Sequence, residues 1–439
     1  MSLSALVWVL LAAAQFLLSL RRPVWAVGLY MQTFFAAPHM WWWGDEIPNA
    51  RYALWAGLLL VVTAGVHHLR VADPSKAPPR TIVPLAAIAM VVNATFVHYF
   101  LASQPSVSLD NYVEFMKYVL LYFAIKASIH DRKDFRLALI CVAMGAAYIG
   151  YEVTINERGS FSGSRLEGVG APAAVTANSL ADVMLVSLPL VGSLFLNRTV
   201  VAKITALVAA PLVLNVLLLC NSRGAFLGLS GAAIAFLLVA RGAVRKKAMQ
   251  TLALAGVTLF LLLGDAEILD RFTSTFVGSE ARDNSASSRL DFWRAGLLML
   301  ADYPLGEGGG SFKYVHGSRY LGEATGAEDP DSRSLHNGYL TEATDWGVQG
   351  LILKMLFIGG ALLAAYRATN QARLDGRIED SLIGMSIFVS GAALMIHCLF
   401  GSFLSNEWTY WIAALLMRYS ELYSKEESPA LAAPVAAAA

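Results

Sequence analysis

Apolar runs close to the length of a membrane span recur along the whole chain and dominate its hydrophobic pattern. They fall near residues 2–20, 24–43, 52–66, 82–101, 113–128, 136–153, 172–196, 202–219, 225–240, 248–263, 347–366, 381–400 and 406–420. A helix needs about 20 apolar residues to cross the hydrocarbon core, so each run predicts a transmembrane helix. Because only Arg21, Arg22 and Pro23 separate the first two runs and 52–66 is short, twelve and thirteen spans both fit.

This pattern predicts an all-α polytopic membrane protein with one large loop. We expect an N-terminal transmembrane bundle at 1–263, a loop at 264–340 that carries the chemistry, and the last transmembrane helices at 341–423. Residues 424–439 are expected to form a disordered tail, since the stretch from Ser428 is rich in Ala and Pro and carries no charge.

Composition supports the membrane assignment and excludes other classes. The chain is 56% hydrophobic and 15% charged, which is too apolar for a surface in water. The run at 2–20 lacks a basic leader and a clear cleavage site, so we interpret it as a retained membrane segment. A net charge of +1 argues against a broad nucleic-acid-binding surface. The three cysteines are far apart and show no metal-binding spacing.

Basic residues predict which connections share a side of the membrane. Lys and Arg cluster in every second connection from residue 70 onward, near 70–80, 126–136, 198–203, 241–247, 367–377 and 418–425. Such clusters are retained in the cytoplasm. The connections near 102–112, 154–171, 220–224, 264–340 and 401–405 are therefore expected outside, which makes the large loop periplasmic in a bacterial inner membrane.

The large loop contains a predicted amphipathic helix at 285–303. Its apolar positions recur at intervals of three and four, at Leu290, Trp293, Leu297 and Leu300. Ser287 or Ser288 is the expected N-cap, and Pro304 should end the helix. The helix should lie on the bundle or at the bilayer interface with Arg289 on its flank. The glycine-rich stretch 305–310 predicts a flexible turn, and it lacks the Lys-Ser/Thr ending of a nucleotide-binding loop.

One histidine stands where the large loop re-enters the membrane. His336 lies in the stretch 334–340, at the depth where a lipid-borne substrate presents its head group. A histidine with a pKa near neutrality can accept a proton from a hydroxyl nucleophile. The alternative is that His336 only hydrogen-bonds a neighbour at the start of a helix.

Two arginines lie in external connections close to hydrocarbon. Arg223 occupies a very short turn between two spans, and Arg165 lies in the connection at 154–171. Charge placed there is costly, and guanidinium groups bind phosphate oxygens in a bidentate way, so a pyrophosphate is a suitable ligand. Snorkelling to the interface, or an ion pair with Glu157, Glu167 or Asp182, is the simpler alternative.

A metal site is also considered, because Glu328, Asp329 and Asp331 have the spacing of the acidic motif that holds a divalent cation on a diphosphate. External arginines already supply positive charge, and this acidic run lies in a polar loop. We therefore predict a solvated loop, with no metal and no cofactor.

Three motifs in this chain resemble those of the O-antigen ligase family. His336-Asn337 is followed after nine residues by 347–350, Gly-Val-Gln-Gly, and Arg223 is followed after three residues by Leu227. The pattern of a Ser-Arg before an amphipathic helix with Trp, ending in Pro-Leu-Gly, also matches 288–306. The resemblance covers about residues 160–355 by motif and the whole chain by topology.

The resemblance implies a membrane glycosyltransferase that moves a glycan from undecaprenyl pyrophosphate to a sugar of lipid A-core, with inversion and without ATP. By the same resemblance His336 is the general base. Arg223 and Arg289, and with them Arg165, hold the pyrophosphate and stabilise the leaving group. Asn337 and Tyr339 orient the site or serve packing.

Three other kinds of function stay open at this point. O-antigen polymerases and protein O-oligosaccharyltransferases share the donor and differ in the acceptor. A transporter or flippase would need ionisable residues at mid-span, whereas the polar residues of this chain concentrate on the external face. A membrane protein with a purely structural role is the remaining alternative.

Overall fold

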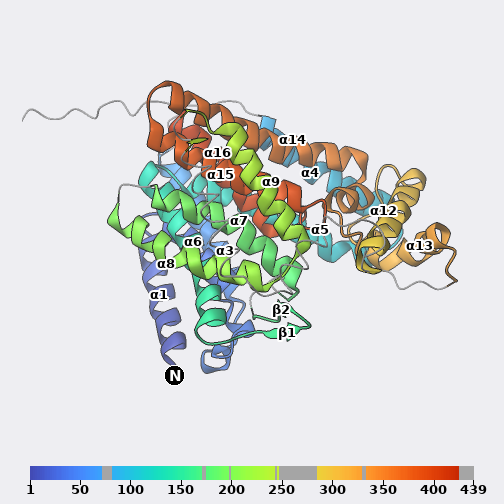
Figure 1. The fold of residues 1–439 in the computed structure, drawn as a ribbon, viewed down its shortest axis with the longest axis horizontal. Coiled ribbons are helices and arrows are strands. Elements are labelled where there is room, and N and C mark those ends of the chain that lie inside the picture. The colour runs from blue at the N-terminus through green and yellow to red at the C-terminus, as the bar shows by residue number, and fades with distance from the viewer. Residues whose placement is uncertain are drawn as a thin grey trace, which may run out of the picture.

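The computed structural model describes residues 1–71, 82–170, 175–196, 199–242, 245–246, 284–328 and 333–424. Its α-helices are α1 Leu3–Ser19, α2 Val24–Phe35, α3 Tyr52–Val71, α4 Ile82–Phe96, α5 Pro105–Ser128, α6 Arg132–Thr154, α7 Ala177–Phe195, α8 Val200–Leu219, α9 Arg223–Val239, α12 Asn284–Asp302, α13 Gly317–Thr325, α14 Gly338–Leu374, α15 Ile378–His397 and α16 Glu407–Tyr423 (Figure 1). Two π-type turns, η3 Val97–Leu101 and η5 Phe312–His316, adjoin α4 and α13. The predicted all-α class is confirmed.

The described residues also contain one small hairpin. Strand β1, Ser160–Ser162, pairs antiparallel with β2, Arg165–Glu167, and places Phe161 opposite Leu166. Sequence analysis treated this stretch as an irregular connection. The hairpin is short, and its importance lies in fixing Arg165 at the edge of the bundle.

Seven helices in the described part of the chain are long and apolar enough to cross a membrane. These are α3, α4 with η3, α6, α7, α8, α14 and α15, while α1 and α9 are shorter apolar helices. The predicted runs at 113–128 and 406–420 fall on α5 and α16, and the run at 248–263 lies outside the described residues. The protein is a multi-pass membrane protein, and the count of twelve or thirteen spans stays a prediction.

The second predicted span is shorter than expected. Helix α2 ends at Phe35, and two 3₁₀ turns follow, η1 Pro38–Met40 and η2 Gly44–Glu46. Pro38 has no backbone N–H to donate and disfavours helical geometry at Ala37, so the helix cannot continue through 24–43. Apolarity alone overestimated this helix.

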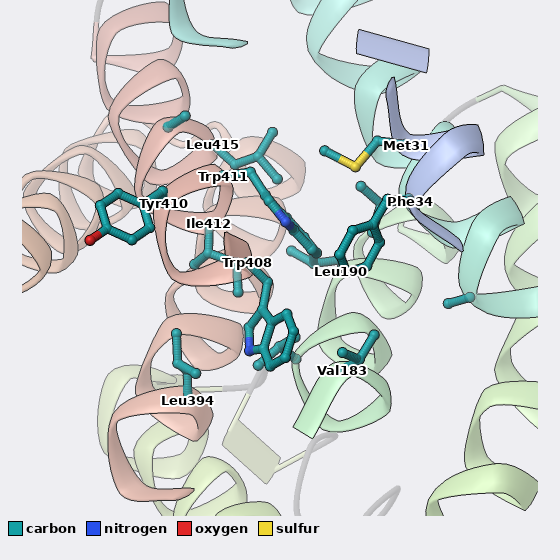
Figure 2. Close-up of a cluster of buried hydrophobic side chains, with 14 of the residues drawn as sticks. Met31, Phe34, Val183, Leu190, Leu394, Trp408, Tyr410, Trp411, Ile412 and Leu415 are labelled. Atoms are coloured by element: carbon teal, nitrogen blue, oxygen red, sulfur yellow. The ribbon is translucent and has the colours of Figure 1, made fainter. Parts of the chain in front are cut away.

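The core of the bundle is built around α16. Trp408 and Trp411 of this helix are buried, and each places its ring centroid 6.3 Å from that of Phe34 in α2. Figure 2 shows Leu190 of α7 and Met31 of α2 in the same cluster. Because α16 also packs on α5, α14 and α15, it links the two ends of the chain around one core.

Contacts between connections agree with the predicted grouping by side. The backbone N–H of Ser103 donates to the Glu307 carboxylate at 3.0 Å, which joins the connection before α5 to the large loop. The amide of Asn221 donates to Ser164 at 3.3 Å, which joins the α8–α9 turn to the hairpin.

The connections that carry the basic clusters also contact one another, through ion pairs. Arg132 pairs with Asp380 at 3.0 Å, and Lys126 pairs with Glu421 at 2.7 Å. These pairs join the α5–α6 connection to those around α15 and α16. Which of the two groups faces the periplasm stays a prediction, as does the division of the chain into four parts.

Candidate active site

Helices α12 and α13 lie together at one end of the molecule, beside the first turns of α14 (Figure 1). Helix α12 ends at Asp302, just before Pro304, as predicted. Its start differs from the prediction. The helix begins at Asn284, three residues before Ser287 and four before Ser288.

The packed face of α12 is not the predicted one. Phe292, Ala295 and Met299 are buried in a small core that also contains Phe312, Tyr320, Leu321 and Leu335. Leu290 and Leu297 belong to the predicted apolar stripe, which was expected on the bundle or at the bilayer interface, and they are 53% and 56% exposed. Both sets of residues recur at intervals of three and four, and the set with Phe292 forms the core. The exposed leucines are available to a bilayer interface.

The glycine-rich stretch 305–310 is a packed turn and not a flexible one. The N–H groups of Glu307 and Gly308 donate to the carbonyls of Thr344 and Asp345, at 3.1 and 2.9 Å. Glu307 is only 6% exposed. The turn therefore fixes the loop after α12 against α14.

A break inside α14 makes this contact possible. Gly347 has φ 81° and ψ 169°, a conformation that is almost confined to glycine, and it interrupts the helical hydrogen bonds of the preceding turn. The side chains of Gln349 and Asn93 donate to the carbonyl of Trp346 at 3.2 and 2.8 Å. Gln349 also donates to Leu305 at 2.8 Å. The motif at 347–350 thus anchors the large loop to the bundle.

The start of α14 fixes the position of His336. Asn337 caps the helix, because its side-chain oxygen accepts from the N–H groups of Tyr339 and Leu340 at 3.0 and 3.1 Å. The Tyr339 hydroxyl donates to the Met395 carbonyl at 2.6 Å. Asn337 and Tyr339 therefore hold the backbone beside the histidine, and neither contact is with the imidazole.

His336 lies just before this cap, with a φ of 50° that non-glycine residues adopt only at a cost. Its ring stands edge-on to Phe292 of α12 at 6.2 Å, and its Nδ1 atom is 3.5 Å from the Ser334 hydroxyl. Burial, together with the charges of Arg289 and Arg333, lowers the pKa of His336. The imidazole is therefore neutral at neutral pH, the form that can accept a proton.

The three arginines singled out from the sequence come together in the structure. Burial lowers the pKa of Arg289, and the nearby charges of Arg165 and Arg223 lower it further. Among the described residues, Arg289 has no hydrogen bond or ion pair of its own. Arg165 of β2 and Arg223 of α9 thus lie within electrostatic reach of Arg289 on α12, and Arg289 in turn acts on His336.

Asn178, at the start of α7, holds two of these elements in place. Its side-chain oxygen accepts from Arg165 at 2.6 Å and from the Ser222 hydroxyl at 2.9 Å. Ser222 in turn caps α9, so Arg223 is the first residue of that helix. The helix N-terminus adds partial positive charge to the cluster. Sequence analysis did not identify Asn178, since an asparagine at a helix start is usually a cap.

Asp182, which was suggested as an ion-pair partner of Arg165, accepts hydrogen bonds from other residues. Asp182 is fully buried and instead accepts from His397 and from the Trp408 indole, both at 2.6 Å. This buried carboxylate lies in α7 and was not recognised as a mid-span charge. Its partners are side chains of α15 and α16.

Two further groups belong to the site. The charge of Arg333 lowers the pKa of His336. In the sequence, the only sign of this role is that Arg333 lies three residues before His336. Trp293 lies one helical turn after Arg289, on the same face of α12, and its indole N–H is buried without a partner in the described structure. Sequence analysis assigned Trp293 to the apolar face only.

The acidic motif at 328–331 cannot be placed. Asp329 and Asp331 lie outside the described residues, so the structure does not test the metal interpretation. Within the described ranges, no group of three or more His, Cys, Asp or Glu side chains is arranged to hold a metal.

Fold and site together define a multi-pass helical membrane protein with a cationic site next to a neutral histidine at one end of its bundle. The sequence model of the O-antigen ligase family matches residues 204–355. The match covers about a third of the chain, and over this segment it confirms the resemblance that the motifs indicate. The matched segment contains Arg223, Arg289 and His336, whereas Arg165 precedes it. No curated protein matches the chain significantly.

Proposed function

We propose that this protein transfers a glycan from undecaprenyl pyrophosphate to a hydroxyl of lipid A-core, at the periplasmic face of a bacterial inner membrane. The family supports membrane glycosyl transfer in general. The particular donor, acceptor and residue roles below are inferred from the chemistry of the site.

The arginine cluster is the proposed site for the pyrophosphate. A pyrophosphate carries charge over several oxygens, and guanidinium groups bind such oxygens in pairs. Arg289 has the strongest case, because it is partly buried beside two cations with no counter-ion among the described residues. The free indole N–H of Trp293, one turn away, is a suitable additional donor.

In the proposed reaction, His336 accepts the proton of an acceptor hydroxyl as its oxygen attacks the anomeric carbon of the donor glycan. The bond from this carbon to the pyrophosphate oxygen breaks, and the electron pair leaves with undecaprenyl pyrophosphate. The arginines stabilise the charge that develops on the leaving group. His336 then loses its proton to water. Attack opposite to the leaving group inverts the anomeric centre.

The observation that carries this proposal is the convergence of the three arginines and His336 from distant parts of the chain. Arg165 and Arg223 act on Arg289 through their charges, and Arg289 acts on His336. A structural role would call for ion pairs to carboxylates, and for Arg289 none is found in the described part of the chain. A cationic site beside a neutral base suits a reaction that releases a diphosphate.

The acceptor is tested with purified protein and a donor of undecaprenyl pyrophosphate carrying a radiolabelled glycan. Lipid A-core, a serine-rich peptide and a second donor molecule are offered separately. Labelling of lipid A-core is expected. Labelling of the peptide, or lengthening of the donor glycan, would instead show a protein O-oligosaccharyltransferase or a polymerase.

A further inference from the structure

A polar cavity of about 240 Å³ lies beside the candidate active site, and the proposed roles of His336 and the arginines do not involve it. It lies between α5, η5 and the first turns of α14, and the connection at 402–406 closes one side. Pockets for drug-sized ligands have roughly 300–1,000 Å³, so this cavity suits one ring-sized group and not an extended chain.

The walls offer hydrogen bonds that the protein does not use. The amides of Asn111 and Asn406 line the cavity, and neither has a side-chain hydrogen bond within the described residues. Each amide can both donate and accept. Glu114 adds a carboxylate on the same face of α5 as Asn111. Such a mixture suits a ligand with several hydroxyl groups.

Aromatic rings form the rest of the wall. Phe115 and Trp346 are buried, whereas Tyr314 is 61% exposed. Their rings offer wide apolar faces, and Tyr118 adds a ring with a hydroxyl. A sugar ring has both surfaces that this wall requires, C–H groups on its faces and hydroxyls around its edge.

The cavity has no excess of positive charge, unlike the arginine cluster. Two acidic side chains, Glu114 and the buried Asp345, line it together with one cation, Lys313, whose ammonium group contacts the Tyr314 hydroxyl at 2.7 Å. A wall without excess positive charge does not favour a phosphate group. The two neighbouring sites would therefore sort their ligands by charge.

A short segment connects the two sites. Ser334 and Leu335 line the cavity, and the next residue is His336. The Ser334 hydroxyl is 3.5 Å from Nδ1 of His336. A hydroxyl held at this wall would thus lie beside the segment that carries His336.

We propose that this cavity binds one uncharged or amine-bearing sugar ring of the acceptor. The assignment of this sugar to the acceptor rests on the proposed function. The binding of a sugar ring by the cavity does not depend on glycan transfer. Glu114 and Asn111 act as specificity residues that hold the ring by its hydroxyls.

The test measures binding and transfer separately. Calorimetry follows the binding of a phosphate-free core oligosaccharide, and of undecaprenyl pyrophosphate, to the purified protein. We expect Glu114→Gln with Asn111→Ala to weaken oligosaccharide binding by about five- to a hundredfold, because two hydrogen bonds to the ring are weakened or lost. Lipid binding should not change. Asp110→Asn, an exposed carboxylate one turn earlier on α5 and outside the cavity, is the matched control.

Each outcome decides one of the two proposals. Loss of oligosaccharide binding in the double variant supports the cavity, even if the wild-type protein transfers no glycan, in which case only the proposed function fails. If the wild-type protein transfers glycan and the double variant keeps its oligosaccharide affinity and its KM for the acceptor, the cavity proposal is overturned. Tighter binding of a phosphorylated core oligosaccharide than of the phosphate-free one would also overturn it.

Discussion

Gly347→Ala is predicted to detach the large loop from the bundle and to abolish most activity. The conformation of Gly347, φ 81° and ψ 169°, costs a non-glycine residue about 1–3 kcal/mol. A Cβ atom at this position would also clash with the backbone carbonyl of Leu305, which is not a flexible group that can swing away. The loop must therefore shift.

The size of the effect follows from the bonds that such a shift would break. Three backbone hydrogen bonds, at 2.9 to 3.1 Å, and one from Gln349, at 2.8 Å, hold residues 304–308 to α14. At about 0.5–1.5 kcal/mol each, these bonds and the conformational cost amount to roughly 3–9 kcal/mol. The lower value already corresponds to a change of about 10² in the equilibrium constant between the docked and the detached loop.

Gly359→Ala is the matched control on the same helix. A Cβ atom at Gly359 meets nothing within 4 Å, and helical geometry favours Ala by up to about 1 kcal/mol. Glycan transfer and the hydrogen exchange of residues 304–310 are measured in both variants. Comparable transfer and equal protection of the loop in Gly347→Ala and Gly359→Ala would refute the anchoring role of this break.

Three further predictions concern the chemistry. Arg223→Lys should lose much of the activity of the wild type, because a lysine cannot make the bidentate contact; near-normal transfer would favour snorkelling. Arg333→Gln should move the acidic limb of the kcat/KM profile to higher pH, since removing a cation raises the pKa of His336; an unmoved limb would contradict this role of Arg333. Transfer should persist in excess EDTA, and a loss that magnesium or manganese restores would show a metal site.

Most of the fold was predictable because membrane helices are long and uniformly apolar. Twelve of the thirteen predicted runs coincide with helices of the described structure, and the thirteenth lies outside it. Errors arose where a local residue overrides apolarity. Pro38 shortened α2, and α12 buries the face of Phe292 in the small core, whereas Leu290 of the predicted stripe is exposed.

The candidate site was predictable in its residue types but not in its geometry. Arg223, Arg289 and His336 stood out through their place at the membrane boundary and through their motifs. Asn178 and Trp293 did not, because their roles depend on contacts between elements that are distant in sequence. The cavity beside α5 was equally invisible, since its walls come from four separate segments.

The central claim is that His336 acts on the acceptor while the arginines hold the donor. The most direct measurement compares His336→Ala with the wild type in single-turnover transfer and in equilibrium binding of undecaprenyl pyrophosphate. We predict that transfer falls by about 10² to 10⁴, the usual contribution of a general base, while donor affinity stays unchanged. Loss of donor binding in His336→Ala, or transfer at the wild-type rate, would contradict the account.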